Sequence, residues 1–249
     1  MKCFGLIGYP LSHSFSKKYF TEKFVREGIS GCSYENFPLG HIDLLPGLIA
    51  GNAGLAGLNV TIPYKEAVIP YLNGLDKVAD AIGAVNTIKI TRNGGEVHCQ
   101  GFNTDAYGFR SSIMPHIGRG FSHALILGTG GASRAVAYVF RGMGLEVTFV
   151  SRNPAGPHRI AYSQLTPELI SGVNIIVNTS PLGMYPHTDA FPCIPYGFLT
   201  PQHVLYDLIY NPEETRFLAN GRKMGAITVN GLQMLHLQAE KSWEIWNTP

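Results

Sequence analysis

The alternation of apolar and polar positions in the first hundred residues predicts a mixture of strands and helices. Short apolar or β-branched runs that end in turn residues predict strands at 3–9, 33–39 and 55–63. Other segments in this part predict helices at 14–28, 42–51, 64–72 and 77–82. Residues 85–103 hold two β-branched runs around Asn93-Gly94-Gly95, which predicts a hairpin. This part of the chain is therefore predicted to be an α/β domain.

The rest of the chain begins with the order of elements found in a dinucleotide-binding domain. An apolar run at 124–127 enters a glycine-rich turn, a helical segment follows at 135–144, and a β-branched run lies at 146–150. This order is that of a βαβ unit. Further strands are predicted within 173–183, 203–211 and 226–230, and an amphipathic helix from Gly231 to Trp246.

We therefore predict an α/β protein of two domains, one that binds substrate and one of the Rossmann type that binds a dinucleotide. The predicted boundaries assign residues 1–103 and 231–249 to the substrate-binding domain and residues 104–230 to the dinucleotide-binding domain. The final helix is expected to return to the substrate-binding domain.

The glycine-rich turn has the composition of an anion site. Gly128 is expected to make the tight turn and Gly130 to let the backbone approach a pyrophosphate, while Ser133 fills the third small position of the pattern. Free N–H groups at the start of the following helix are expected to face the phosphates. The alternative is a glycine turn with a purely structural role.

Arg152 comes directly after the second strand of this βαβ unit. NAD-binding versions carry an acid there for the ribose 2′-hydroxyl, whereas an arginine there accommodates a 2′-phosphate. The sequence holds no acid between Thr148 and Arg159. This favours NADP as the cofactor over the alternative, a solvated arginine in a turn.

Composition narrows the class of protein further. The 249 residues are 45% hydrophobic and 14% charged, which is typical of a globular α/β enzyme. A net charge of +2 is too small to indicate nucleic acid or an anionic membrane as a partner. The four cysteines are scattered, the histidines lack metal-ligand spacing, and neither a secretory signal nor a spanning helix is evident. We therefore expect a cytoplasmic protein without a metal site.

Polar side chains gather where three predicted strands end. They are Ser12-His13-Ser14, then Asn59 with Thr61 and Lys65, and finally Asn103-Thr104-Asp105. Ligands of α/β sheets bind outside the carboxyl ends of the strands. Hydroxyls near a helix start can hold a small carboxylate, although one of these serines as a simple helix cap is the alternative.

Lys65 and Asp105 have the chemistry that oxidation of an alcohol by a nicotinamide requires. A lysine can accept the hydroxyl proton, or return it, while hydride moves. Because an adjacent carboxylate favours the charged lysine, we expect Asp105 to orient Lys65 rather than to lower its pKa. An ordinary surface lysine is the alternative at position 65.

The motifs taken together resemble those of the shikimate dehydrogenase family over almost the whole chain. In order, they are IGYPLSHSFS from Ile7, NVTIPYK, GAVNT, GFNTDAYG, GTGGASRA, NTSPLGM, YNPEET and GLQMLHLQA ending at Ala239. The resemblance implies an NADP-linked oxidoreductase that reversibly reduces 3-dehydroshikimate to shikimate on the route to chorismate and the aromatic amino acids. The implied partners are therefore small molecules.

The resemblance also implies roles for individual residues. The implied catalytic pair is Lys65 and Asp105. Ser12 and Ser14 would bind the substrate carboxylate, and the ring hydroxyls would contact Thr61, Asn86, Tyr210 and Gln238. The implied cofactor residues are Gly128, Thr129, Gly130, Gly131 and Ala132 for the pyrophosphate, Arg152 for the 2′-phosphate, and Leu208 and Gly231 near the nicotinamide.

One departure from the family pattern leaves alternatives open. The usual NRT motif with a second basic residue is here SRNPAGPHR from Ser151, so His158 or Arg159 would have to supply the second positive charge. A quinate/shikimate dehydrogenase with relaxed use of NAD and NADP is therefore one alternative.

Two further alternatives fit the sequence less well. A non-catalytic sensor of a shikimate-like ligand would be expected to lack Lys65 or Asp105. The YxxxK spacing of Tyr19 and Lys23 is reminiscent of short-chain dehydrogenases but precedes the glycine loop, so we expect a packed tyrosine and a solvated lysine on an ordinary helix. A monomer and a homodimer are both compatible with the sequence.

Overall fold

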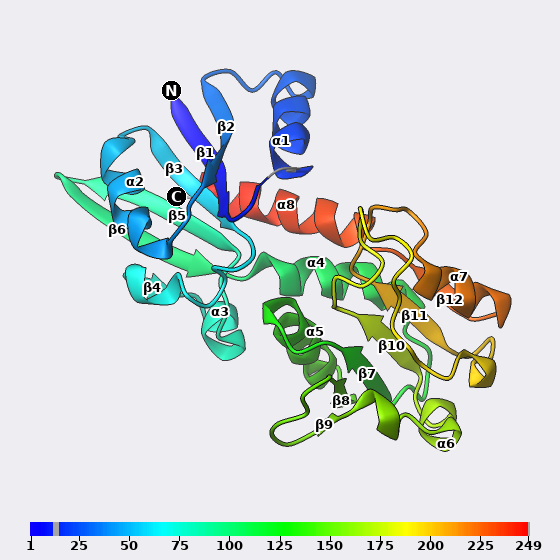
Figure 1. Cartoon of the computed structure of the whole chain (residues 1–249). Helices are drawn as coiled ribbons and strands as arrows, with labels where there is room; N and C mark the ends of the chain where they lie inside the picture. Colours follow the sequence, from blue (N-terminus) through cyan, green and yellow to red (C-terminus); the bar gives the residue numbers. More distant parts are fainter. Residues whose placement is uncertain (12–14, 249) are drawn as a thin grey trace. The chain divides into compact units, whose positions relative to one another are not determined.

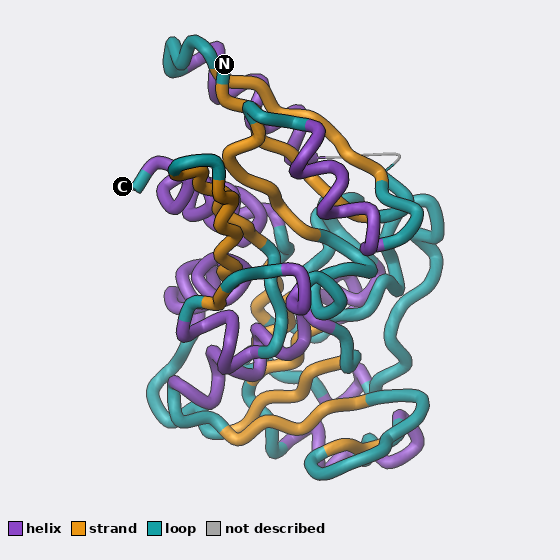
Figure 2. The backbone as a smooth tube through the Cα atoms, turned by 90° about the vertical axis from the view of Figure 1, so that its left-hand side faces the viewer, coloured by secondary structure: helices purple, strands orange, loops and turns teal. Residues whose placement is uncertain are grey.

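The computed structural model describes residues 1–11 and 15–248, so Ser12 and Ser14 lie outside the described residues. The chain forms two compact units. Unit 1 contains Met1–Thr104 together with the residues from Ala239 onward, and unit 2 contains Asp105–Gln238. Strands appear as arrows in Figure 1 and in orange in Figure 2.

Unit 1 contains a mixed six-stranded sheet with the strand order β2-β1-β3-β5-β6-β4. Strand β1 pairs in parallel with β2 and β3, whereas β5 runs antiparallel to β3 and β6. The strands are β1 (Lys2–Gly8), β2 (Cys32–Pro38), β3 (Leu55–Val60), β4 (Gly74–Leu75), β5 (Thr87–Asn93) and β6 (Glu96–Phe102). This pairing brings the ends of β1, β3 and β6 and the start of β5 to one edge of the sheet.

The predicted hairpin is confirmed as β5 and β6. Asn93 pairs with Glu96, so the connection consists of Gly94 and Gly95. Both have positive φ, 59° and 92°. Positive φ at both central residues is what a two-residue hairpin turn of the right twist requires, and glycine adopts it without strain.

The helices of unit 1 follow the predictions except at 64–72. The α-helices are α1 (Phe15–Arg26), α2 (Leu45–Gly51) and α3 (Lys77–Ile82), with 3₁₀ turns η1 (Ile42–Leu44) and η2 (Ile69–Tyr71). Asp76 caps α3 by accepting hydrogen bonds from the backbone N–H groups of Val78 and Ala79, at 3.2 and 2.9 Å. The predicted helix at 64–72 is wrong, because only turns and η2 form there. Pro70 lacks the N–H that a longer helix needs, and it disfavours helical backbone at the preceding residue.

The end of α8 (Leu232–Asn247) completes the core of unit 1. Trp246 stacks on Phe4 with ring centroids 4.8 Å apart, and its indole N–H donates to the carbonyl of Ile88 at 2.9 Å. A Cβ added to Gly57 on β3 would overlap the Trp246 ring. The central strand therefore needs glycine at this position, because the indole lies directly on its backbone.

Lys23 on α1 is buried rather than solvated, so the sequence expectation for this residue is wrong. Its ammonium contacts Glu240 on α8 at 2.7 Å and Glu27 at 2.9 Å, and Tyr19 also donates to Glu240. Desolvation lowers the pKa of Lys23, but the hydrogen bonds to Glu240 and Glu27 outweigh it and leave the pKa raised. Burial of a charge is tolerated when it is paired in this way.

Unit 2 contains a six-stranded sheet with the order β12-β11-β10-β7-β8-β9, in which every pair is parallel. Taken along the chain, this is the 3-2-1-4-5-6 order of a doubly wound dinucleotide-binding fold, which confirms the predicted Rossmann-type sheet. The order reverses between β7 and β10, where such folds bind their ligands. The strands are β7 (His123–Leu127), β8 (Glu146–Val150), β9 (Arg159–Ile160), β10 (Ile175–Asn178), β11 (Val204–Asp207) and β12 (Ile227–Val229).

Three helices of the structure were not predicted, namely α4 (Thr104–Ile113), α6 (Pro167–Ser171) and α7 (Arg216–Lys223), whereas α5 (Gly131–Gly142) and α8 were. In α4, Gly108 and two serines have low helix propensity, so the sequence signal for a helix is weak. Tertiary packing stabilises the helix in spite of this low propensity. Phe109 contacts the rings of Phe140 and Tyr206 at 5.2 and 5.1 Å. Among the described residues, none of the helices combines the length and the apolar character needed to cross a bilayer.

We predict that Gly57→Ala lowers the free energy of unfolding by about 1–3 kcal/mol, because the added methyl group forces the Trp246 ring or β3 to move. Urea denaturation measures the change. Gly47→Ala in α2 is the matched control, since an added Cβ there meets no atom within 4 Å. Equal stability of the two variants would contradict the packing of Trp246 on Gly57.

Candidate functional site

The glycine-rich turn leads from β7 into α5 at the carboxyl edge of the unit 2 sheet. Gly128 has a φ of 122°, and its N–H donates to the carbonyl of Val150 on β8 at 2.9 Å. A Cβ at Gly128 would lie 2.6 Å from the Thr179 hydroxyl oxygen. Both the backbone conformation and the close approach of Thr179 therefore require glycine at this position.

Gly130 is the N-cap of α5, and an added Cβ there would meet no atom within 4 Å. Gly131 and Ala132 form the start of the helix, and Thr129 precedes the cap. Ser133 is buried and donates to the carbonyl of Gly130 at 2.6 Å, so the third small residue locks the turn onto the helix. The turn thus presents backbone N–H groups and open space at the positive end of a twelve-residue helix, which is an arrangement suited to a phosphate.

Arg152 is exposed in the loop after β8, at the same edge of the sheet as the glycine turn. Burial raises the pKa of Tyr162, and the positive charge of Arg152 partly offsets that rise, so the two residues are electrostatic neighbours. Of the two candidates for a second positive charge, Arg159 donates to the carbonyl of Ala155 at 2.9 Å within its own loop. His158 has a positive φ of 55°.

Leu208 and Gly231 meet in unit 2, although they are far apart in sequence. A Cβ on Gly231 would overlap the carbonyl of Leu208, and the Gly231 N–H donates to Ile209 at 3.0 Å. Tyr210 follows, half-buried, and burial raises the pKa of its phenol. Gln238 is buried on α8 and donates to the carbonyl of Leu235 at 3.1 Å.

A buried carboxylate that was not predicted as a site residue, Asp207, organises the ends of β10 and β11. One oxygen accepts hydrogen bonds from the Asn178 amide and the Ile209 N–H, both at 3.0 Å. The other accepts the hydroxyl of Thr215 at 2.6 Å, and Thr215 caps α7. The sequence feature that could have identified Asp207 is an acidic residue at the end of an otherwise apolar predicted strand. Asp207 therefore fixes the backbone that carries Leu208.

Burial also perturbs the acidity of Asp207. Desolvation raises its pKa to about 6, against the opposing effect of the three hydrogen bonds it accepts. A carboxyl group without exposed surface loses hydration that those donors only partly replace.

In unit 1, the residues predicted to contact substrate lie at the edge where β1 and β3 end. The Thr61 N–H donates to the carbonyl of Ile7 at 2.9 Å, which ties the residue after β3 to β1. The carbonyl of Lys65 accepts the N–H of Val85 at 2.7 Å, so Lys65 lies beside the start of β5. The structure thus brings Thr61 and Lys65 to the edge of the sheet at which Asn86 immediately precedes β5.

The amide of Asn86 is held in one orientation. Its oxygen accepts the backbone N–H of Thr104 at 2.6 Å, and its nitrogen donates to the hydroxyl of Thr104 at 2.9 Å. Because a backbone N–H can only donate, the oxygen of Asn86 must face Thr104. Asp105 follows in the first turn of α4 and is also buried, at a helix end that favours a negative charge.

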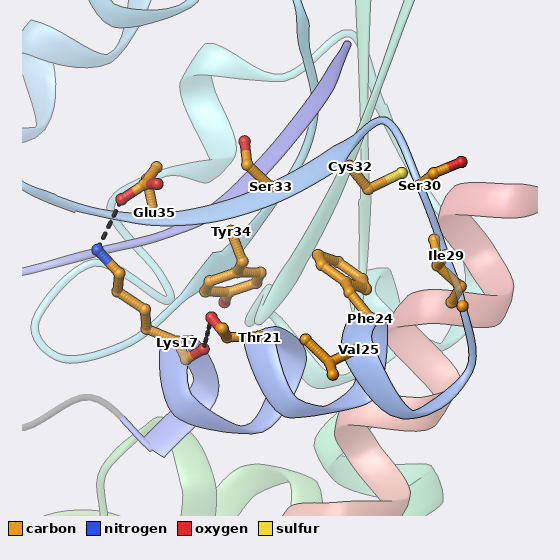
Figure 3. Close-up of a pocket in the computed structure, with 11 residues that line it drawn as sticks. Lys17, Thr21, Phe24, Val25, Ile29, Ser30, Cys32, Ser33, Tyr34 and Glu35 are labelled. Carbon is orange, nitrogen blue, oxygen red and sulfur yellow. Dashed lines mark hydrogen bonds and ion pairs between the residues drawn. The ribbon is translucent and has the colours of Figure 1, made fainter.

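A groove of about 660 Å³ lies elsewhere in unit 1, between α1 and the edge strand β2 (Figure 3). Phe24, Val25 and Tyr34 contribute apolar side chains to its lining, and the ion pair of Lys17 with Glu35, at 2.7 Å, lies at one end. Among residues 1–11 and 15–248, none of the predicted site residues lines this groove.

Comparison with known proteins identifies relatives that span the chain. A family model described as the shikimate dehydrogenase substrate binding domain matches residues 6–88. A protein of Desulforamulus reducens named shikimate dehydrogenase (NADP(+)) is 35% identical over 266 residues, covering 97% of this chain and 88% of the relative.

Solved structures of similar proteins also match almost the whole chain. Shikimate 5-dehydrogenase from Thermus thermophilus, in complex with NADP(H) and shikimate, is similar with a TM-score of 0.85 and 31% identity, covering 99% of this chain and 94% of that one. Quinate dehydrogenase from Corynebacterium glutamicum, in complex with NAD, is similar with a TM-score of 0.86 and 26% identity, covering 99% and 93%.

We predict that Asp207 makes stability depend on pH between about 4 and 6. Because the pKa rises from 3.8 in the unfolded chain to about 6, the folded chain holds the proton more tightly in this interval. The free energy of unfolding should therefore fall by about 3 kcal/mol as the pH rises through it. Urea denaturation across this pH range measures the slope.

The Asp207→Asn variant should lack this component of the slope. Asp43→Asn removes the same charge from an exposed position and should keep the wild-type slope. Identical pH profiles for the wild-type protein and Asp207→Asn would rule out the assignment.

Proposed function

Because the chain belongs to the shikimate dehydrogenase family, we propose that it catalyses the reversible reduction of 3-dehydroshikimate to shikimate with NADPH. The resemblance inferred from the motifs is thereby confirmed. The observation that carries the proposal is the similarity, at 35% identity over 97% of the chain, to a curated NADP-dependent shikimate dehydrogenase. The protein is an oxidoreductase of the route to chorismate and the aromatic amino acids.

The residues at the carboxyl edge of unit 2 fit a dinucleotide. Bound NADPH supplies hydride to the substrate carbonyl. The N–H groups of the Gly128–Ala132 turn are proposed to bind the pyrophosphate, supported by the open space at Gly130 and the start of α5. Arg152 is proposed to bind the 2′-phosphate, and Leu208 and Gly231 to lie near the nicotinamide.

Lys65 and Asp105 are proposed as the catalytic pair. The Lys65 ammonium is proposed to donate a proton to the alkoxide that forms as the carbonyl accepts hydride. In the reverse direction the same amine accepts the proton. Asp105 is proposed to orient the ammonium and a ring hydroxyl.

The substrate is proposed to be held through its carboxylate and its ring hydroxyls. Ser12 and Ser14 are assigned to the carboxylate on the family motif alone. Thr61, Asn86, Tyr210 and Gln238 are assigned to the hydroxyls, and for Thr61 and Asn86 the proposal is supported by their place at one edge of the unit 1 sheet. We accordingly propose residues 1–103 and 231–249 as the substrate-binding domain and 104–230 as the NADP-binding domain.

Two further attributes are proposed from the sequence. Scattered cysteines without a pairing pattern favour the cytoplasm. The protein is proposed to act as a monomer or a homodimer on small-molecule substrates.

A second candidate is a quinate/shikimate dehydrogenase that also uses NAD. It is favoured by the altered SRNPAGPHR segment and by the similarity to a quinate dehydrogenase in complex with NAD. The absorbance of the reduced nicotinamide, followed with shikimate or quinate and with NADP or NAD, separates the two candidates. Comparable rates with quinate or with NAD would assign the broader activity.

We predict that the wild-type protein oxidises shikimate with NADP and that Lys65→Ala lowers kcat by about 10²–10⁴-fold, the usual contribution of a positioned acid or base. Lys77→Ala, at an exposed lysine of the same unit, should keep the wild-type kcat. Near-normal turnover by Lys65→Ala would refute the role of Lys65, and an inactive wild-type protein would refute the function.

We predict that Arg152→Ala raises KM for NADP by about tenfold or more, because charge-assisted hydrogen bonds to the 2′-phosphate are lost, at about 1.5–3 kcal/mol. KM for NAD, which lacks that phosphate, should stay within about twofold. Arg141→Ala removes an exposed arginine from α5 as the control. An equal rise in KM for NADP and for NAD would show that Arg152 does not bind the 2′-phosphate.

A further inference from the structure

Three buried hydroxyls form a triangle in unit 1. They belong to Thr87 on β5, Thr104 at the start of α4, and Ser242 on α8. The Ser242 oxygen lies 2.8 Å from that of Thr87 and 3.2 Å from that of Thr104, and the two threonine oxygens are 3.2 Å apart. All three residues are at most 1% exposed. The triangle therefore joins three elements through hydroxyl groups that water does not reach.

The asparagine on one side of the triangle is oriented unambiguously. The Asn59 nitrogen donates to the backbone carbonyl of Asn86 at 3.3 Å, and because a carbonyl can only accept, this bond fixes the amide. The nitrogen also donates to the Ser242 hydroxyl at 3.0 Å, and the oxygen accepts the phenol of Tyr34 at 2.8 Å. A hydroxyl has one proton to donate and two lone pairs to accept with. A hydroxyl of the triangle can therefore donate to one neighbour and still accept from Asn59, which donates to Thr87 as well, at 3.3 Å.

Asn86 is attached to the same triangle from the other side. Its nitrogen donates to the Thr104 hydroxyl at 2.9 Å, and that bond uses a lone pair of Thr104. The Asn86 oxygen is also within hydrogen-bond distance of the Thr104 and Thr87 hydroxyls, at 3.2 and 3.3 Å, so these hydroxyls can donate either to it or within the triangle. The Asn86 side chain is thus held by the backbone N–H of Thr104 and by the Thr104 hydroxyl, and the second of these contacts is linked to Ser242.

We propose that Ser242 is a positioning residue for substrate recognition, acting through Thr104 on the amide of Asn86. The inference rests on the proposed function, in which Asn86 contacts a ring hydroxyl of shikimate. The Ser242 hydroxyl closes the triangle, so that the nitrogen of Asn86 is held ready to donate. The C-terminal helix thereby determines the geometry of a substrate contact that belongs to the central sheet.

Loss of this hydroxyl should affect shikimate more than the cofactor. In Ser242→Ala the Thr87 and Thr104 hydroxyls lose a partner and can rotate, which loosens Asn86. One net hydrogen bond corresponds to about a three- to tenfold change in affinity. KM for shikimate should therefore rise by about three- to tenfold, whereas KM for NADP should stay within about twofold. Ser242→Cys retains the volume with a weaker donor and should give an intermediate KM for shikimate.

Ser112→Ala is the matched control for burial. Ser112 is also a helix serine with no exposed surface, and its hydroxyl lies 2.8 Å from that of Tyr206 in unit 2. It should lose a similar amount of thermal stability while its KM for shikimate stays at the wild-type value. A comparable rise in KM for shikimate in Ser112→Ala would show that general destabilisation accounts for the effect and would overturn the proposal.

A double-mutant cycle with Asn86→Ala tests the route through Asn86. If Ser242 acts through that amide, Ser242→Ala should change KM for shikimate by less than about twofold in the Asn86→Ala background. The same fold-change in both backgrounds, or an unchanged KM for shikimate in Ser242→Ala alone, overturns the positioning role and leaves the proposed function standing. A wild-type protein that does not oxidise shikimate overturns the proposed function and this inference together.

Discussion

Parallel pairing of strands is the constraint on which the rest of this structure depends. Strands that run the same way end at the same edge of a sheet, so the residues that follow them are gathered there whatever their separation in the chain. In unit 2 this brings the glycine turn after β7, the Arg152 loop after β8 and Asp207 at the end of β11 to one edge. In unit 1 it does the same for Thr61 after β3, and the β5–β6 hairpin adds Asn86 because its first strand begins where β3 ends.

Buried polar groups supply the precision that pairing alone does not. Asp207 joins two strand ends and the cap of α7, and the hydroxyl triangle joins a strand to two helices. Each group is almost completely removed from water, so an unmade hydrogen bond in either network would cost more than the bond contributes on balance. Such networks have few acceptable geometries, and they hold the neighbouring backbone in one of them.

Local chemistry determined which parts of the fold could be predicted. Gly94 and Gly95 specify their turn by themselves, and the β7–α5 segment carries its own strand, turn and helix signals. The predicted helix at 64–72 is wrong because the apolar residues there have helical spacing, whereas Pro70 prevents a helix from forming. Helix α4 was missed because its stability comes from the packing of Phe109 and not from its own sequence.

Buried polar side chains could not be predicted where their partners are distant in sequence. The burial of Lys23 depends on Glu240, which is 217 positions away. The partners of Asp207 are likewise determined by the order of the strands. The roles assigned to Lys65, Asp105 and the other site residues stay predictions.

The docking of the C-terminal half of α8 onto β1 and β3 has a consequence for the order of synthesis. Unit 2 is made from one continuous stretch of chain, whereas unit 1 needs residues that follow unit 2. During translation, unit 2 can therefore fold once Gln238 has been made. The Phe4 face of the first sheet is covered only in part, by Phe20 and Phe24 of α1, until Trp246 emerges. A nascent chain of this architecture completes its second domain before its first.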